Sequence, residues 1–134
     1  MKPEYANLLV VEDPSTSSPG LAFLLATIAH SGDDGWHDWW TRLRDNGVEV
    51  VDSWSTAYYE RFSGSAGSQG DRPLVVSYGS SPPAEVVFAD PPRDDAPTGV
   101  AAETCFRQIE YTGVLRGTPH TAEARRLEIG RAHV

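Results

Sequence analysis

The fold is decided by residues 8–28, which read LLVVEDPSTSSPGLAFLLATI. The opening run, Leu8-Leu9-Val10-Val11, is short, unbroken and rich in branched side chains, as in a strand buried on both faces of a parallel sheet. After a polar turn, Ser18-Pro19-Gly20 offers a helix start with proline in the first turn. One buried helical stripe then follows at i, i+3, i+4 and i+7, formed by Leu21, Leu24, Leu25 and Ile28. The stretch predicts a strand followed directly by a helix.

Strand and helix patterns continue to alternate along the chain. Residues 48–51 and 74–77 are short valine-rich runs that predict a second and a third strand. Helical spacing of aromatic and apolar side chains predicts helices over 36–43 and 53–62, and a short helix over 84–89. This alternation implies an α/β unit with a mostly parallel sheet and helices packed on its faces.

The remaining segments are read from their composition. Residues 63–70 are rich in glycine and serine, and residues 90–99 contain three prolines, so both are predicted to be loops. Residues 104–115 alternate between two sets of side chains, which predicts a longer, half-exposed strand. A helix-like pattern follows at residues 122–127.

Composition excludes several functional classes. Among 134 residues, 11 basic and 19 acidic side chains give a net charge of -8, which disfavours nucleic acid and anionic membranes as partners. The single cysteine, Cys105, excludes an internal disulfide and a cysteine-cluster metal site. No apolar run approaches the roughly 18 to 20 residues that a membrane-spanning helix requires.

The two ends of the chain are unusual. Residues 1–5 are polar and lead straight into the first strand, without the basic and apolar regions of a secretion signal. The last seven residues, 128–134, resemble a translated sequencing adapter, so we expect a non-native tail there. We therefore expect residues 1–127 to be a fragment of a longer protein, truncated at both ends.

Three turns connect a predicted strand end to a predicted helix start: residues 13–20, 52–57 and 77–84. In open parallel sheets, ligands bind outside the carboxyl ends of the strands, so these turns are the candidate site. Small hydroxyl residues at a helix start suit an anion such as phosphate, although serine also caps helices that bind nothing. Two such clusters occur, and they contain Thr16, Ser17 and Ser18, and Gly79, Ser80 and Ser81.

Two aromatic residues stand at the same predicted strand ends. Trp54 and Tyr78 are suited to stacking on a flat or cationic ring, because the aromatic face attracts cations. Each of them, taken alone, is also a common kind of core residue.

Three blocks of the sequence carry a resemblance to a known family. They are VEDPSTSSPGL at residues 11–21, SWSTAY at 53–58 and VVSYGSSP at 75–82. In this order, within a similarity that covers nearly all of residues 5–127, they resemble the second lobe of the thiamine-binding subunit of bacterial ABC importers. The resemblance implies that residues 1–127 form a partial lobe of a type II periplasmic-binding-protein fold. It also implies the absence of the first lobe and of a late tryptophan-bearing segment.

The resemblance implies a function as well. The protein is expected to be the substrate-binding component of an importer for thiamine, thiamine monophosphate or thiamine diphosphate, not an enzyme, with neither a cofactor nor a metal. Its expected partners are the small-molecule ligand and the permease and ATPase subunits, and the protein itself is expected to be a monomer. Its expected location is periplasmic or extracellular, with lipid anchoring left open. The matching positions imply ligand contacts by Ser17, Ser18, Trp54, Tyr78, Gly79, Ser80 and Ser81.

Three alternatives remain open. The same scaffold can carry ferric iron or an organophosphonate, but the Tyr58-Tyr59 pair falls within a helix, where adjacent side chains point about 100° apart. We therefore expect one core and one surface tyrosine. A serine-dependent hydrolase using Ser80 or Ser81 would lack both the second glycine of a nucleophile elbow and a positioned histidine. A purely structural domain would bind no small molecule.

Overall fold

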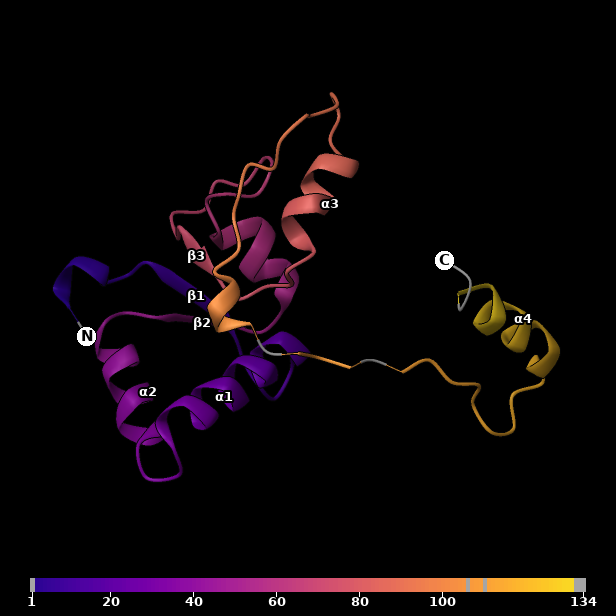
Figure 1. Ribbon diagram of the computed structural model, residues 1–134, viewed down its shortest axis with the longest axis horizontal. Coiled ribbons are helices and arrows are strands. Elements are labelled where there is room, and N and C mark those ends of the chain that lie inside the picture. The colour runs from indigo at the N-terminus through magenta and orange to yellow at the C-terminus, as the bar shows by residue number, and fades with distance from the viewer. Residues whose placement is uncertain (1, 106, 110, 132–134) are drawn as a thin grey trace.

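The structure is a computed structural model that describes residues 2–105, 107–109 and 111–131 (Figure 1). Its body contains a three-stranded parallel sheet with strand order β2-β1-β3. The strands are β1 (Leu9–Glu12), β2 (Glu49–Val51) and β3 (Leu74–Val75). The helices α1 and α2 lie on one side of this sheet and α3 lies on the other (Figure 1). The predicted α/β class with a parallel sheet is therefore confirmed.

The central strand β1 forms the core of the body. Val10 pairs with Glu49 of β2 and with Val75 of β3, so β1 has a neighbour on each edge. Val10 and Val11 are completely buried, as the unbroken apolar run predicts. Because all strands are parallel, the turns after β1, β2 and β3 leave the sheet at the same edge.

Helix α1 (Ser18–Ser31) follows β1 closely. Its N-cap is Ser17, one residue before the predicted cap, and Pro19 lies in its first turn. Gly20 packs on the end of β1, because a Cβ at this position would lie 2.8 Å from the carbonyl carbon of Glu12 and closer still to its oxygen. The absence of a side chain at residue 20 therefore lets α1 fold back on the sheet.

Helix α2 (Trp36–Asp45) packs against α1 through aromatic contacts. The edge of Phe23 meets Trp39 and Trp40 at centroid distances of 6.1 and 5.8 Å. The Trp40 indole Nε1 donates a hydrogen bond of 2.9 Å to Thr27 Oγ1. The tryptophan stripe of α2 therefore serves packing between helices.

Two short helical elements follow the other strands. After β2, the π-helix η2 (Thr56–Arg61) replaces the predicted helix over 53–62, and Phe62 N donates to Ala57 O across five residues at 2.9 Å. After β3 comes α3 (Ser81–Val87), which begins three residues earlier than predicted. Both elements begin at the carboxyl edge of the sheet.

An ion cluster ties β2 to the elements beside it. Glu49 accepts a hydrogen bond of 2.6 Å from Arg61 Nε of η2, and its other carboxylate oxygen lies 3.2 Å from Arg72 Nε. Arg72 also donates to the carbonyl oxygen of Gly47 at 2.9 Å. The loop over 63–70 is therefore fixed at both of its ends.

The strand predicted over residues 104–115 is wrong. The 3-10 helix η3 (Ala102–Thr104) ends at Thr104, the first residue of the predicted strand. No described residue after η3 forms a strand. Phe106 and Glu110 lie outside the described residues. The segment leaves the body without a strand beside it (Figure 1), and Ile109 is 64% exposed. Alternating side chains stabilise a strand only where a neighbour supplies hydrogen bonds and packing.

The described chain ends with helix α4 (Thr121–Arg131), which Figure 1 shows apart from the body. It contains the helix predicted over 122–127 and extends into the predicted tail, of which residues 132–134 lie outside the described part. A further 3-10 helix, η1 (Pro3–Tyr5), precedes β1. Over the described residues, no helix has the length and apolarity needed to cross a bilayer.

Candidate functional site

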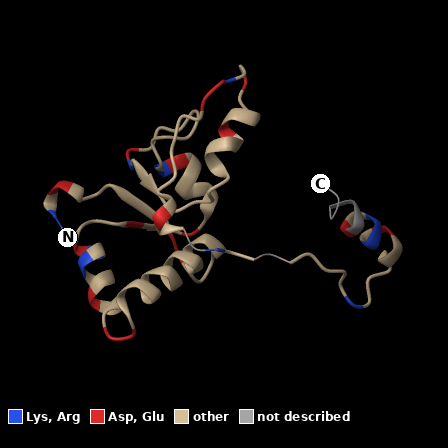
Figure 2. Ribbon diagram, viewed as in Figure 1, with Lys and Arg blue, Asp and Glu red and all other residues tan. Residues whose placement is uncertain are grey.

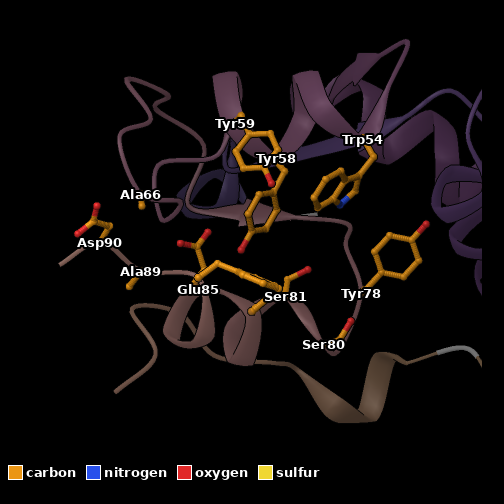
Figure 3. Close-up of a pocket in the computed structure, with 12 residues that line it drawn as sticks. Trp54, Tyr58, Tyr59, Ala66, Tyr78, Ser80, Ser81, Glu85, Ala89 and Asp90 are labelled. Atoms are coloured by element: carbon orange, nitrogen blue, oxygen red, sulfur yellow. The ribbon is translucent and has the colours of Figure 1, made fainter. Parts of the chain in front are cut away.

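An open pocket of about 530 Å³ lies where the turns after β2 and β3 meet (Figure 3). Trp54 and η2 form one wall, Tyr78 and α3 form the other, and the loop over 63–70 contributes one residue. Two of the three turns predicted to form a site therefore come together. The lining residues are Trp54, Tyr58, Tyr59, Ala66, Tyr78, Ser80, Ser81, Ala84, Glu85, Phe88, Ala89 and Asp90.

The pocket is dominated by aromatic rings. Trp54 stacks on Tyr58 with centroids 5.0 Å apart and ring planes 17° apart. Tyr59 meets the same indole edge-on at 5.3 Å, and Tyr78 lies at 6.1 Å from it. Such a cluster presents electron-rich faces to a flat or cationic ligand.

A hydrogen-bonded chain holds the indole in place. Trp54 Nε1 donates to Ser77 Oγ at 2.8 Å, and Ser77 Oγ shares a second hydrogen bond of 2.8 Å with Ser81 Oγ. These three residues come from the turn after β2, the end of β3 and the start of α3. The chain therefore fixes the position of Trp54 relative to the opposite wall of the pocket.

Tyr58 and Glu85 meet at the base of the pocket. The Tyr58 hydroxyl and the Glu85 carboxylate point toward one another (Figure 3), outside strict hydrogen-bond geometry. Burial, with an added contribution from the negative charge of Glu85, raises the pKa of Tyr58 to about 12. A carboxylate therefore acts electrostatically on the aromatic cluster.

The predicted site residues divide into two groups. Trp54, Tyr78, Ser80 and Ser81 line the pocket, whereas Gly79 lines a neighbouring hollow of about 630 Å³. Residues 17 and 18 are at the start of α1 and line neither hollow.

The first turn is organised by its own hydrogen bonds. The Asp13 carboxylate accepts bonds from Ser15 Oγ at 2.5 Å and from Ser15 N at 2.7 Å, and both lower the pKa of Asp13. Thr16 Oγ1 donates to the carbonyl oxygen of Asp52 at 2.7 Å. The first turn therefore contacts the second one, but its contacts do not extend the aromatic pocket.

The sequence did not single out the other eight lining residues as part of a site: Tyr58, Tyr59, Ala66, Ala84, Glu85, Phe88, Ala89 and Asp90. Glu85 stands four residues after Ser81 in α3, which is the spacing of neighbours on one helical face. That spacing was available as a signal. One core and one surface tyrosine were expected at this pair, which is confirmed, because Tyr58 is 3% exposed and Tyr59 is 53% exposed.

Glu12 is a buried ionisable residue that the sequence did not reveal. It ends β1, is 1% exposed, and neither carboxylate oxygen has a hydrogen-bond partner among the described residues. Burial raises its pKa from 4.5 to about 7, because the ionised carboxylate loses its contact with water. Glu12 lines neither hollow, so it bears on stability and not on ligand contact.

The alternatives of a metal site and a serine hydrolase both depend on the placement of individual side chains. Within the part of the chain that the structure describes, no three His, Cys, Asp or Glu side chains form a group that could hold a metal ion. Ser81 Oγ shares its hydrogen bond with another serine and not with a histidine.

The fold and the pocket define an α/β unit with an aromatic site at the carboxyl edge of its sheet. No family model and no solved structure matches the chain significantly. The chain is similar to curated proteins described as thiamine-binding periplasmic proteins, from Brucella abortus biovar 1, Brucella suis biovar 1 and Brucella melitensis biotype 1. Each is 34% identical over 77 residues, which span 58% of this chain and 21% of the relative.

Proposed function

We propose that this chain is part of the solute-binding protein of an ABC importer, and that its ligand is thiamine or a phosphate ester of thiamine. The observation that carries the proposal is the pocket in which Trp54, Tyr58, Tyr59 and Tyr78 surround one space at the carboxyl edge of the sheet. The similarity to the Brucella thiamine-binding proteins supports it.

The aromatic rings account for ligand recognition. Thiamine carries a positively charged thiazolium and a flat pyrimidine, and both can stack against the exposed aromatic faces. The Trp54 indole is already oriented by its bond to Ser77, so little conformational freedom is lost on binding. The hydroxyl of Ser80 offers a polar contact at the rim.

The full importer cycle involves parts beyond this chain. A type II binding protein encloses its ligand between two lobes, and here one open wall is proposed to face the missing lobe. Permease and ATPase subunits are then the proposed partners, and the periplasm or the cell exterior is the proposed location. The proposal describes a binding protein and not an enzyme, as the names of the relatives suggest.

The test is a calorimetric titration of thiamine into the 134-residue chain, repeated with Trp54→Ala. Because the pocket is open, we expect a dissociation constant on the order of 0.1–1 mM. Trp54→Ala is expected to weaken binding by at least about tenfold, since it removes the central aromatic face. Trp36→Ala is the matched control, because Trp36 lies on α2 and does not line the pocket.

Two results would contradict the proposal. One is the absence of binding at millimolar thiamine by a chain whose circular dichroism shows it to be folded. The other is equal loss of binding in Trp54→Ala and Trp36→Ala, which would place the ligand away from the pocket. A screen of ferric iron and organophosphonates would then be the next step.

A further inference from the structure

We propose that Glu85 sets the charge preference of the aromatic pocket, so that the pocket favours a cationic ring without phosphate over the phosphorylated forms of the same compound. The inference rests on the proposed function and deepens it, because it names the form of the ligand and the residue that selects it. Neither the sequence pattern nor the relatives assign a role to this glutamate.

The charged side chains that line the pocket have one sign. Glu85 and Asp90 are acidic, and none of the described lining residues is Lys or Arg. On the loop after α3, Figure 2 shows further acidic positions and a basic one; the basic residue, Arg93, does not line the pocket, and the chain as a whole carries a net charge of -8. A phosphate entering here would approach carboxylates without a cation to balance it.

Glu85 is placed to act on the ligand and not only on the solvent. It is half-buried in α3, one helical turn after Ser81, which the hydrogen-bonded chain fixes against Ser77. Its carboxylate reaches the base of the pocket beside Tyr58, whose ring stacks on Trp54 (Figure 3). A cation held against these rings would lie beside the carboxylate. Its attraction to the aromatic faces and its attraction to the negative charge of Glu85 would therefore both favour binding.

The serine-rich helix starts that were predicted to hold a phosphate do not balance the negative charge of the carboxylates in this pocket. Ser81 is 8% exposed and its hydroxyl is paired with Ser77. Helix α3 has only seven residues, and the serines at the start of α1 do not line the pocket. The pocket therefore contains an attraction for positive charge without a matching site for negative charge.

The experiment compares the affinities of thiamine, thiamine monophosphate and thiamine diphosphate for the full 134-residue chain. We expect thiamine to bind about tenfold more tightly than the diphosphate, with the monophosphate between them. A diphosphate that binds as tightly as thiamine, or more tightly, would overturn the inference. This comparison needs no variant, so it remains decisive even if a substitution impairs folding.

Glu85→Gln then tests the residue. It removes the charge at nearly constant volume, so we expect thiamine affinity to fall about threefold and the preference over the diphosphate to shrink. Glu85→Asp is expected to retain most of the preference. Glu103→Gln, which removes an exposed acidic side chain outside the pocket, is the matched control. An unchanged ratio in Glu85→Gln would overturn the role of Glu85.

The two proposals fail in different ways. If no form of thiamine binds, the proposed function is wrong and the inference falls with it. If thiamine and its esters bind through Trp54 with equal affinities, the proposed function stands and only the charge preference is wrong.

Discussion

Glu12 places an ionisable side chain at the end of the central strand, where it is only 1% exposed. Burial of the neighbouring Val10 and Val11 side chains stabilises the fold. Burial of the Glu12 carboxylate costs free energy, because the carboxylate loses its water and gains no hydrogen-bond partner among the described residues. The neutral, protonated form of Glu12 is therefore favoured in the folded state, which raises its pKa to about 7.

This raised pKa makes the stability of the body depend on pH. Below the unfolded value of 4.5 the carboxyl is protonated in both states. Between 4.5 and about 7 only the unfolded state gives up the proton, so the stability falls as the pH rises over this range, and the loss is complete above 7, where both states are ionised. We expect Glu12→Gln to raise the free energy of unfolding by about 3 kcal/mol at pH 8 and by almost nothing at pH 4.5. Urea denaturation followed by tryptophan fluorescence at both pH values measures the difference.

The control for Glu12→Gln is Glu123→Gln, since Glu123 is exposed on α4. It is expected to leave the free energy of unfolding unchanged at both pH values. A stabilisation by Glu12→Gln that is the same at pH 4.5 and pH 8 would rule out ionisation as its cause.

At the scale of elements, the junction between β1 and α1 depends on one missing side chain. Gly20→Ala would bring a Cβ against the backbone of Glu12, which cannot move without disturbing the central strand. We expect the variant to lose about 3 kcal/mol of stability. Thermal unfolding measures the loss.

Gly113→Ala serves as the comparison for Gly20→Ala, because a Cβ at residue 113 meets no heavy atom within 4 Å. Its melting temperature is expected to match that of the parent chain. Equal melting temperatures for Gly20→Ala and the parent chain would show that α1 does not approach β1 as described.

The elements also show what the sequence was able to predict. The strand β1 was recognisable because its apolar run and its burial agree. Helix α1 forms where its spacing predicts it, but the predicted stripe is not its buried face, because Leu21 and Leu25 are 45% and 43% exposed and the buried residues of the helix are Pro19, Gly20 and Thr27. Residues 104–115 carry the same kind of signal, but a strand also needs a neighbour, which no local pattern reports. The π-helical form of η2, which turns both tyrosines toward the pocket, likewise depends on its packing against the sheet.

For the pocket, sequence reasoning identified the aromatic residues at strand ends but not the acidic wall. Trp54 and Tyr78 follow directly from the rule that ligands bind at the carboxyl edge. Glu85 and Asp90 line the pocket because α3 begins at Ser81 and because the face of α3 that carries Glu85 is turned toward Tyr58. Whether Ser17 and Ser18 contact a ligand stays a prediction.

At the scale of the whole molecule, Figure 1 shows the body and α4 joined by an extended segment, and most of the described residues between 105 and 120 are exposed. Arg107 and Arg116 lie in this segment, are exposed and belong to no helix or strand. We expect trypsin to cleave early after these two residues, and also after Arg93, which is exposed in the loop after α3, because these segments can bind to a protease without local unfolding. Mass spectrometry of a time course should show an early fragment that ends at Arg107.

Arg42 and Arg44 provide the internal reference for this digestion, since both are exposed but lie within α2. Their cleavage is expected only after the body unfolds. Cleavage at Arg44 as early as at Arg107 would contradict the compact body that the sheet and α1 form.

The central place of β1 in the sheet also sets the order in which the molecule can assemble. β1 is made first, yet its partners come from residues 49–51 and 74–75, so both sheet contacts close long loops. On the ribosome, this apolar strand lacks its first partner until residues 49–51 have been synthesised and its second partner until residues 74–75 have been synthesised. Folding is therefore expected to be late and abrupt, and the emerging chain to be a natural client of chaperones that bind short apolar segments.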